Sequence, residues 1–128
     1  MDAIPTDPPL VCYSDAGVID AVTRHRVADV VVSGTVLDSP HFFRGSRTHA
    51  LHEQFAIVTE HGLHLQVIDN VDLAPRLPVQ AGDVVAVAGQ FVPKGRGGII
   101  HDTHHCPGPG WHQGGWIEWR GTRYELPV

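Results

Sequence analysis

The chain has 128 residues and a formal net charge of -5, with 42% hydrophobic and 18% charged residues. A chain of this length fits one domain with one hydrophobic core, and the composition excludes wholesale disorder. The acidic balance disfavours general binding to duplex nucleic acid, because that affinity comes mostly from basic side chains that displace counterions. No stretch is long and apolar enough to predict a membrane span.

The start of the chain predicts a tail followed by one helix. Residues 1–13 contain three prolines, which disfavour regular structure, so a flexible tail is expected before a single domain of residues 14–128. The leading Met favours a native start, and without a leader segment the expected location is the cytoplasm. Ser14 or Asp15 can cap a helix, because apolar residues follow at helical spacing.

Five strands are predicted after the helix. Residues 27–37 are rich in β-branched side chains, and the runs 52–59 and 63–68 alternate apolar with polar residues around a Glu60-His61-Gly62 turn. Residues 84–92 resume a strand, with a bend or bulge expected at Gly89, and a fifth strand begins at Ile99. Five strands with this spacing predict a small closed barrel.

Two further segments complete the predicted fold. Residues 39–50 are expected to form a loop, with Phe42 and Phe43 anchoring it in the core because aromatic area is usually buried. Residues 116–119 and 122–126 flank a two-residue link and predict a hairpin. The fold class is therefore mainly β: a five-stranded barrel resembling an oligonucleotide/oligosaccharide-binding (OB) fold, with one N-terminal helix and a C-terminal hairpin.

The stretch Gly97–Cys106 holds three histidines, an aspartate, a threonine and a cysteine behind a predicted strand. If it stays extended, His101, Thr103 and His105 share one face, and at ~3.3 Å per residue His101 and His105 stand about 13 Å apart. That separation is too long for one ion with bonds near ~2.0 to 2.1 Å. A shared metal site therefore requires a bend before Pro107 or ligands from elsewhere in the chain.

The first functional hypothesis is a histidine-rich site for a ligand or a divalent transition metal. Imidazole with thiolate suits zinc best, and an open coordination position would activate water. The alternative is that these histidines satisfy buried backbone groups or pack beneath tryptophans, with no cofactor. The candidate metal ligands are His52, His101, His104, His105 and Cys106.

The second hypothesis is a hydrolase that acts on an anionic, phosphate-containing substrate. His101 or His104 would be the catalytic general base, and the sequence shows no matched nucleophile motif. Whether the chain is an enzyme is therefore left open by its sequence. The residues expected to bind the ligand are Asp69, Asn70, Arg76 and Arg47.

The third hypothesis is a module that binds single-stranded nucleic acid or oligosaccharide. Arginines would meet phosphate, while aromatic side chains would stack on bases or sugars. These aromatic residues are Phe42, Phe43, Trp111, Trp116 and Trp119. Pairing of the barrel edge with a second copy is a further class of role that nothing in the sequence demands.

Other polar residues have a simpler interpretation. Arg44 with Arg47, and Lys94 with Arg96, form two basic pairs that suit a small anionic ligand, although solvated loop charge explains both. Three of the ten histidines lie in polar or turn-like settings and are expected to be ordinary surface residues without partners. These are His25, His61 and His64. The two cysteines, Cys12 and Cys106, predict no disulfide framework.

Several short motifs occur in order along the chain. They are Gly45-Ser46-Arg47, His52 with Phe55, Asn70-x-Asp72-Leu73-Ala74-Pro75-Arg76, Gly82-Asp83, Gly97-Gly98, His101-x-Thr103-His104-His105-x-Pro107 and Gly115-Trp116-Ile117. Over residues 15–126 this pattern resembles an uncharacterised family of small bacterial proteins whose hallmark is an IHWTHHDP-like segment. That family has no established activity, so the resemblance implies no function. Asp102, Cys106 and Asp69 depart from the pattern, which has Trp, Asp and His there.

Overall fold

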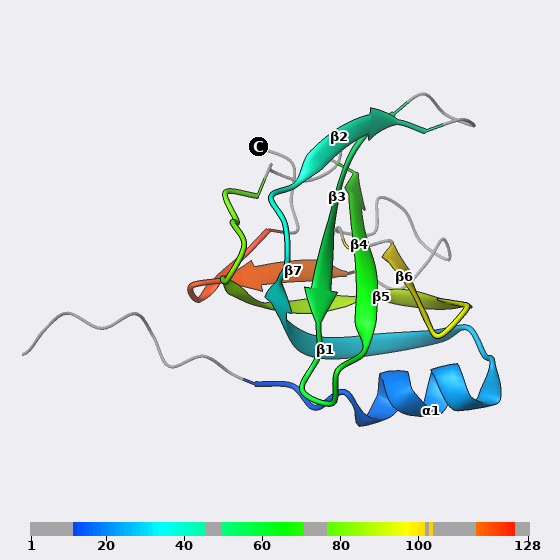
Figure 1. Cartoon of the computed structure of the whole chain (residues 1–128). Helices are drawn as coiled ribbons and strands as arrows, with labels where there is room; N and C mark the ends of the chain where they lie inside the picture. The colour runs from blue at the N-terminus through cyan, green and yellow to red at the C-terminus, as the bar shows by residue number, and fades with distance from the viewer. Residues whose placement is uncertain (1–11, 46–49, 71–76, 102, 104–114, 125–128) are drawn as a thin grey trace, which may run out of the picture.

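A computed structural model of the chain describes residues 12–45, 50–70, 77–101, 103 and 115–124 (Figure 1). Within these residues the chain forms one helix and eight strands. In chain order they are α1 (Ala16–Arg24), β1 (Ala28–Val36), β2 (His41–Arg44), β3 (Leu51–Val58), β4 (His64–Asn70), β5 (Val84–Lys94), β6 (Gly97–His101), β7 (Trp116–Trp119) and β8 (Thr122–Arg123).

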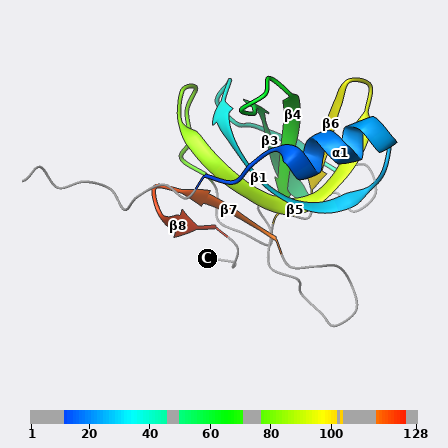
Figure 2. The same ribbon diagram turned by 90° about the horizontal axis from the view of Figure 1, so that it is seen from below.

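Five of the strands form a closed ring of pairings. The order is β1, β3, β4, β6 and β5, and β5 pairs back with β1. The β4–β6 pairing is parallel and the other pairings in the ring are antiparallel. The mainly β fold and its five principal strands are thus confirmed. The hairpin of β7 and β8 lies outside the ring against β5 (Figure 2).

The core fills the inside of the ring. Every second residue of β1 and β3 is buried, as expected for strands with one face turned to a core. The largest side chains that are fully enclosed come from four ring strands and from β7. They include Phe55, Ile57, Leu65, Phe91, Ile100 and Ile117.

Helix α1 lies across one end of the ring, opposite the end at which β2 stands (Figure 1). It contacts β1 and β5 and contributes Val18 and Ala21 to the core. The helix was expected, but the Asp15 side chain does not cap it. The Ser14 hydroxyl instead accepts the Ala16 N–H at 3.1 Å, which leaves the Asp15 carboxylate for partners elsewhere.

The predicted loop of residues 39–50 contains a strand, and its two phenylalanines are not core anchors. Residues of β2 pair with the first half of β3 only, beyond the part of β3 that pairs with β1. All four residues of β2 are exposed, and Phe42 and Phe43 retain 47% and 36% of their accessible surface. The prediction failed because β2 extends outside the ring, where no other described strand or helix packs over it.

The segments at the two ends of the domain match their predicted character in part. The β7–β8 hairpin turns at Arg120 and Gly121, whose φ angles of 51° and 79° suit a two-residue hairpin link. Residues 1–11 of the predicted tail lie outside the described part, whereas the Tyr13 N–H donates to the Ser33 hydroxyl at 2.8 Å. In the described residues, no helix has the length and apolar character that a membrane crossing requires.

Gly89 lies where β5 changes partners along one edge. Residues 85–88 pair with β7 and residues 90–94 pair with β6, while pairing with β1 runs without interruption on the other edge. The predicted bulge is therefore absent from the pairing with β1. A Cβ atom at position 89 would lie 2.5 Å from the His101 carbonyl oxygen, so the glycine allows the end of β6 to approach.

We predict that Gly89→Ala lowers the free energy of unfolding by about 1 to 3 kcal/mol, because backbone atoms must move to admit the methyl group. Urea unfolding followed by circular dichroism measures the change. Gly17→Ala is the matched control, since Gly17 is helical with open space around it. It should stabilise the protein by about 0.5 to 1 kcal/mol. Equal effects of the two substitutions would contradict the close approach.

Candidate functional site

Three strand ends meet at the end of the ring that faces away from α1. Because β4 and β6 run parallel, their carboxyl ends lie side by side, and antiparallel β3 begins at the same place (Figure 1). His52 of β3 is paired with Asn70 of β4, and His101 is the last residue of β6. The structure therefore gathers three residues of the predicted site that are distant in sequence.

Strand alternation divides this end into an inner and an outer face. Glu53 and Asp69 each lie two residues from a buried core residue on the same strand, so they point into the ring. His52 has the opposite parity and points outward. A single ion bound by His52 would therefore not also be bound by Asp69.

The inner face holds a pair of carboxylates. Glu53 and Asp69 are directly opposite in the antiparallel β3–β4 pairing, and both are fully buried. The Leu77 N–H donates to Glu53 Oε1 at 3.0 Å, and the Thr103 hydroxyl lies 2.9 Å from the Ile68 carbonyl oxygen and 3.1 Å from Asp69 Oδ1. Both carboxylates also take part in further interactions.

Sequence reasoning did not single out Glu53, although a signal was present. Glu53 has the same strand parity as Phe55 and Ile57, so it belongs to the inward face of a half-buried strand. An acidic residue is rarely fully buried unless it has a partner. Its position therefore predicted a buried carboxylate with polar partners.

The outer face begins with a stacked pair. The rings of Phe43 and His52 lie 5.3 Å apart with an angle of 17° between their planes. His52 Nδ1 lies 2.9 Å from the Ala50 carbonyl oxygen, which can only accept, so Nδ1 carries the hydrogen. In the neutral ring Nε2 then has a lone pair.

Two further pairs of polar side chains form hydrogen bonds on the outer face. Gln54 donates to Gln66 across the sheet at 2.9 Å, and His101 Nε2 lies 2.8 Å from Gln90 Oε1. Among the described residues, no carboxylate projects from the outer face of β2, β3, β4 or β6. That pattern is unexpected in a chain with 14 acidic residues and a net charge of -5.

Two of the predicted stacking aromatics are engaged with arginines. The Arg123 guanidinium lies 4.0 Å from the ring centre of Trp116, and that of Arg120 lies 4.7 Å from the ring centre of Trp119. Both tryptophans belong to the hairpin outside the ring and not to the β3–β4 face. Five of the predicted site residues and one aromatic lie outside the described residues: Arg47, Arg76, His104, His105, Cys106 and Trp111.

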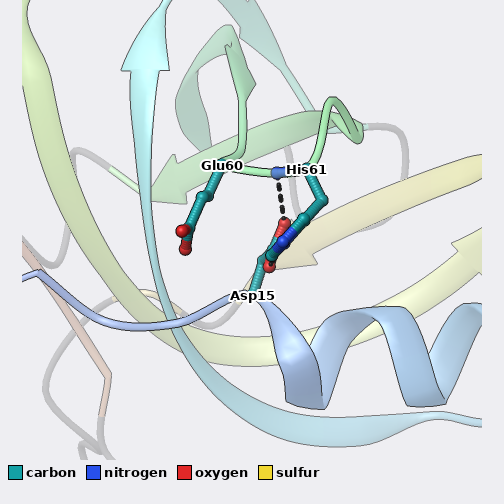
Figure 3. Close-up of side chains that lie close together, drawn as sticks. All are labelled: Asp15, Glu60 and His61. Atoms are coloured by element: carbon teal, nitrogen blue, oxygen red, sulfur yellow. Dashed lines mark hydrogen bonds and ion pairs between the residues drawn. The ribbon is translucent and has the colours of Figure 1, made fainter.

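Asp15, Glu60 and His61 form the one group of described residues whose potential ligand atoms all lie within 4.8 Å of one another (Figure 3). The Asp15 carboxylate accepts the Thr59 hydroxyl at 2.6 Å, the His61 N–H at 2.9 Å and the His61 ring Nδ1–H at 2.6 Å. Because its oxygens are used in this way, Asp15 joins the start of α1 to the β3–β4 turn.

This contact shifts the pKa values of both Asp15 and His61. Burial raises the pKa of Asp15, but hydrogen bonds from Thr59 and His61 and the charge of His61 outweigh burial and lower the pKa from 3.8 to about 2. The hydrogen bond to Asp15 and its negative charge raise the pKa of His61 above 6.5. His61 is exposed, as expected, but the expectation that it has no partner is wrong, because a contact between residues 46 apart leaves no local pattern.

Comparison with known proteins gives a family but no activity. A family model described as a protein of unknown function, DUF3465, matches residues 9–125. The chain belongs to the DUF3465 family. No curated protein and no solved structure matches it. The expected membership of an uncharacterised family is confirmed, and any function of this DUF3465 protein must be argued from its own residues.

We predict that Asp15→Asn flattens the pH dependence of the stability of the DUF3465 fold. The charged Asp15 stabilises the fold above pH 3.8, and this is lost as pH falls towards 2. Protonated His61 stabilises it below pH 6.5, and this is lost as pH rises through its raised pKa. The variant should lose about 1 to 3 kcal/mol of unfolding free energy between these limits and less outside them.

Urea titrations across this pH range test the prediction. Asp20→Asn is the control, because exposed Asp20 pairs with exposed Arg24 one helical turn away, and its loss should cost less than about 0.5 kcal/mol. If the loss of unfolding free energy in Asp15→Asn is the same at every pH, the charges of Asp15 and His61 do not contribute to stability.

Proposed function

We propose that this DUF3465 protein is an OB-like module that binds single-stranded nucleic acid on the outer face of β3 and β4. The observation that carries the proposal is the half-exposed Phe43–His52 stack at one end of that face. Aromatic platforms bind bases without sequence preference because every base has a π-face. A stacked pair presents such a platform with its orientation already fixed.

The ring topology supports this placement. OB folds bind ligands across the second and third strands of a five-stranded barrel and through the loops beside them. In the ring of this chain, β3 and β4 are second and third. The connection before β3 contains β2 with Phe43, exposed Lys94 ends β5, and exposed Arg96 lies in the β5–β6 turn.

Charge favours nucleic acid over oligosaccharide as the ligand. Among the described residues, the outer face of β2, β3, β4 and β6 has histidines and glutamines but no carboxylate, so this part of the sheet does not repel phosphate. Lys94 and Arg96 lie at the β5–β6 turn, and the backbone of Gly97 approaches that of His64 at the start of β4. A strand would thus meet cationic groups at one end of the face and the stack at the other.

We expect Phe43→Ala to weaken binding of a fluorescent oligonucleotide of about 12 nucleotides by about 5- to 150-fold, the loss of one stacked base. Anisotropy at low salt, at about pH 5.5 and again at about pH 8, gives the affinities. A duplex of equal length should bind more weakly.

Phe42→Ala is the matched control, because Phe42 is the adjacent aromatic residue on the opposite face of β2. It should change affinity by less than about twofold. Absence of binding at both pH values, or a larger loss in Phe42→Ala, would disprove the proposed face.

A transition-metal site at His52 is the second candidate function. The His52 Nδ1–H contact with the Ala50 carbonyl is the type of outer hydrogen bond that orients metal-binding histidines and leaves Nε2 for the ion. Zinc would be held with further ligands from His101, His104, His105 or Cys106, and it would supply charge and Lewis acidity. A hydrolase that uses His101 or His104 with Arg47 or Arg76 stays a prediction.

We expect untagged protein to bind about one zinc ion per chain if this second function is correct. His52→Ala should lose the ion, and His25→Asn should keep it, because His25 ends α1 on the far side of the ring. Elemental analysis after dialysis measures the content. Sub-stoichiometric zinc in the unmodified protein, or full retention in His52→Ala, would reject the site.

A further inference from the structure

Three side chains form a row across the proposed binding face, beside the stack of Phe43 on His52. Gln54 of β3 lies on the same face as His52, two residues along the strand, and Gln66 of β4 is directly paired with Ile99 of β6. All three side chains are half-buried. The sequence does not show this row, because residues 54, 66 and 99 become neighbours only through strand pairing.

The two amides of the row hold each other in place. Gln54 Nε2 donates to Gln66 Oε1 at 2.9 Å, and within the part of the chain that the structure describes neither amide makes another hydrogen bond. Gln54 thus keeps its carbonyl oxygen as an acceptor, and Gln66 keeps both of its N–H groups as donors. An acceptor and a donor therefore stand next to each other on two adjacent strands.

Ile99 adds apolar surface next to the donor. It alternates with buried Ile100 along β6, so its side chain projects from the outer face. Its place is fixed on both sides, because it is paired with Gln66 of β4 and with Val92 of β5. From β3 through β4 to β6, the row thus presents an acceptor, a donor and an apolar side chain.

Thymine carries complementary groups in the same order along one edge. Its N3–H is a donor, the neighbouring O4 is an acceptor, and the methyl group on C5 follows O4. The N3–H would donate to Gln54, O4 would accept from Gln66, and the methyl group would lie against Ile99. Uracil has the same polar groups without the methyl group, so it would leave Ile99 uncovered.

We propose that Gln54, Gln66 and Ile99 recognise one thymine of a single DNA strand, next to the base that stacks on Phe43. This inference rests on the proposed function and names the class of its ligand. The platform of Phe43 and His52 accepts any base, whereas the row selects one base by its donor, its acceptor and its methyl group. At ~3.4 Å per residue Gln54 lies about 7 Å from His52 along β3, so the two sites serve separate nucleotides.

The experiment compares labelled thymidine and deoxyuridine strands of about 12 nucleotides by anisotropy at low salt. The two strands have the same sugar and the same phosphate charge, so a difference in affinity reports the methyl group alone. We expect the thymidine strand to bind about three- to fivefold more tightly, which is the gain from burying one methyl group. Ile99→Ala should reduce this ratio to less than about 1.5, and Ile99→Val should give an intermediate ratio.

Ile68→Ala is the matched control, because Ile68 is a half-buried isoleucine of the same face that is paired with Gln54 and not with Gln66. It should leave the ratio of the two affinities unchanged. Gln66→Met should weaken binding of both strands equally, by about 2- to 12-fold, because it removes the donor to O4. Circular dichroism checks the fold of each variant.

Three results would overturn the inference and leave the proposed function intact. They are equal affinity for the two strands, a ratio that Ile68→Ala abolishes or Ile99→Ala preserves, and unchanged binding of both strands by Gln66→Met. Binding of neither strand to the unmodified protein would reject the proposed function as well.

Discussion

The ring of strands depends on the ability of β5 to pair with three neighbouring strands. One edge of β5 pairs with β1 along most of its length, and the other edge pairs first with β7 and then with β6. The change of partner falls at Gly89, where the His101 carbonyl comes too close for any side chain. This approach lets the end of β6 lie against β5 while β6 also pairs with β4, so the position of His101 in the candidate site depends on this glycine.

The opposed carboxylates of Glu53 and Asp69 place a second constraint on the sheet. A register shift of one residue between β3 and β4 would move one face of a strand to the other side, exposing core residues and burying His52. Buried ionisable groups are costly without compensation, and Leu77 and Thr103 supply part of it from two other segments. The polar interior thus ties three parts of the chain to one register.

Local sequence patterns predicted the strands and the helix whose residues alternate between a buried and an exposed face. Alternation located β1, β3, β4 and β5, and helical spacing located α1. The pattern failed at β2, because a short exposed strand resembles a polar loop, and hydrophobicity alone did not place Phe42 and Phe43. Sequence proximity also drew attention to residues 101–106, whereas the stack of Phe43 on His52 depends on long-range pairing.

The contact between Asp15 and the β3–β4 turn has a consequence for the order of folding. Asp15 is separated from Thr59 and His61 by 44 and 46 residues, and the intervening chain contains β1, β2 and β3. Closing so long a loop costs entropy before any bond is gained, whereas the β3–β4 hairpin closes locally. A nine-residue helix is marginal by itself in water. We therefore expect α1 to become persistent late, after the hairpin has formed the turn to which Asp15 binds.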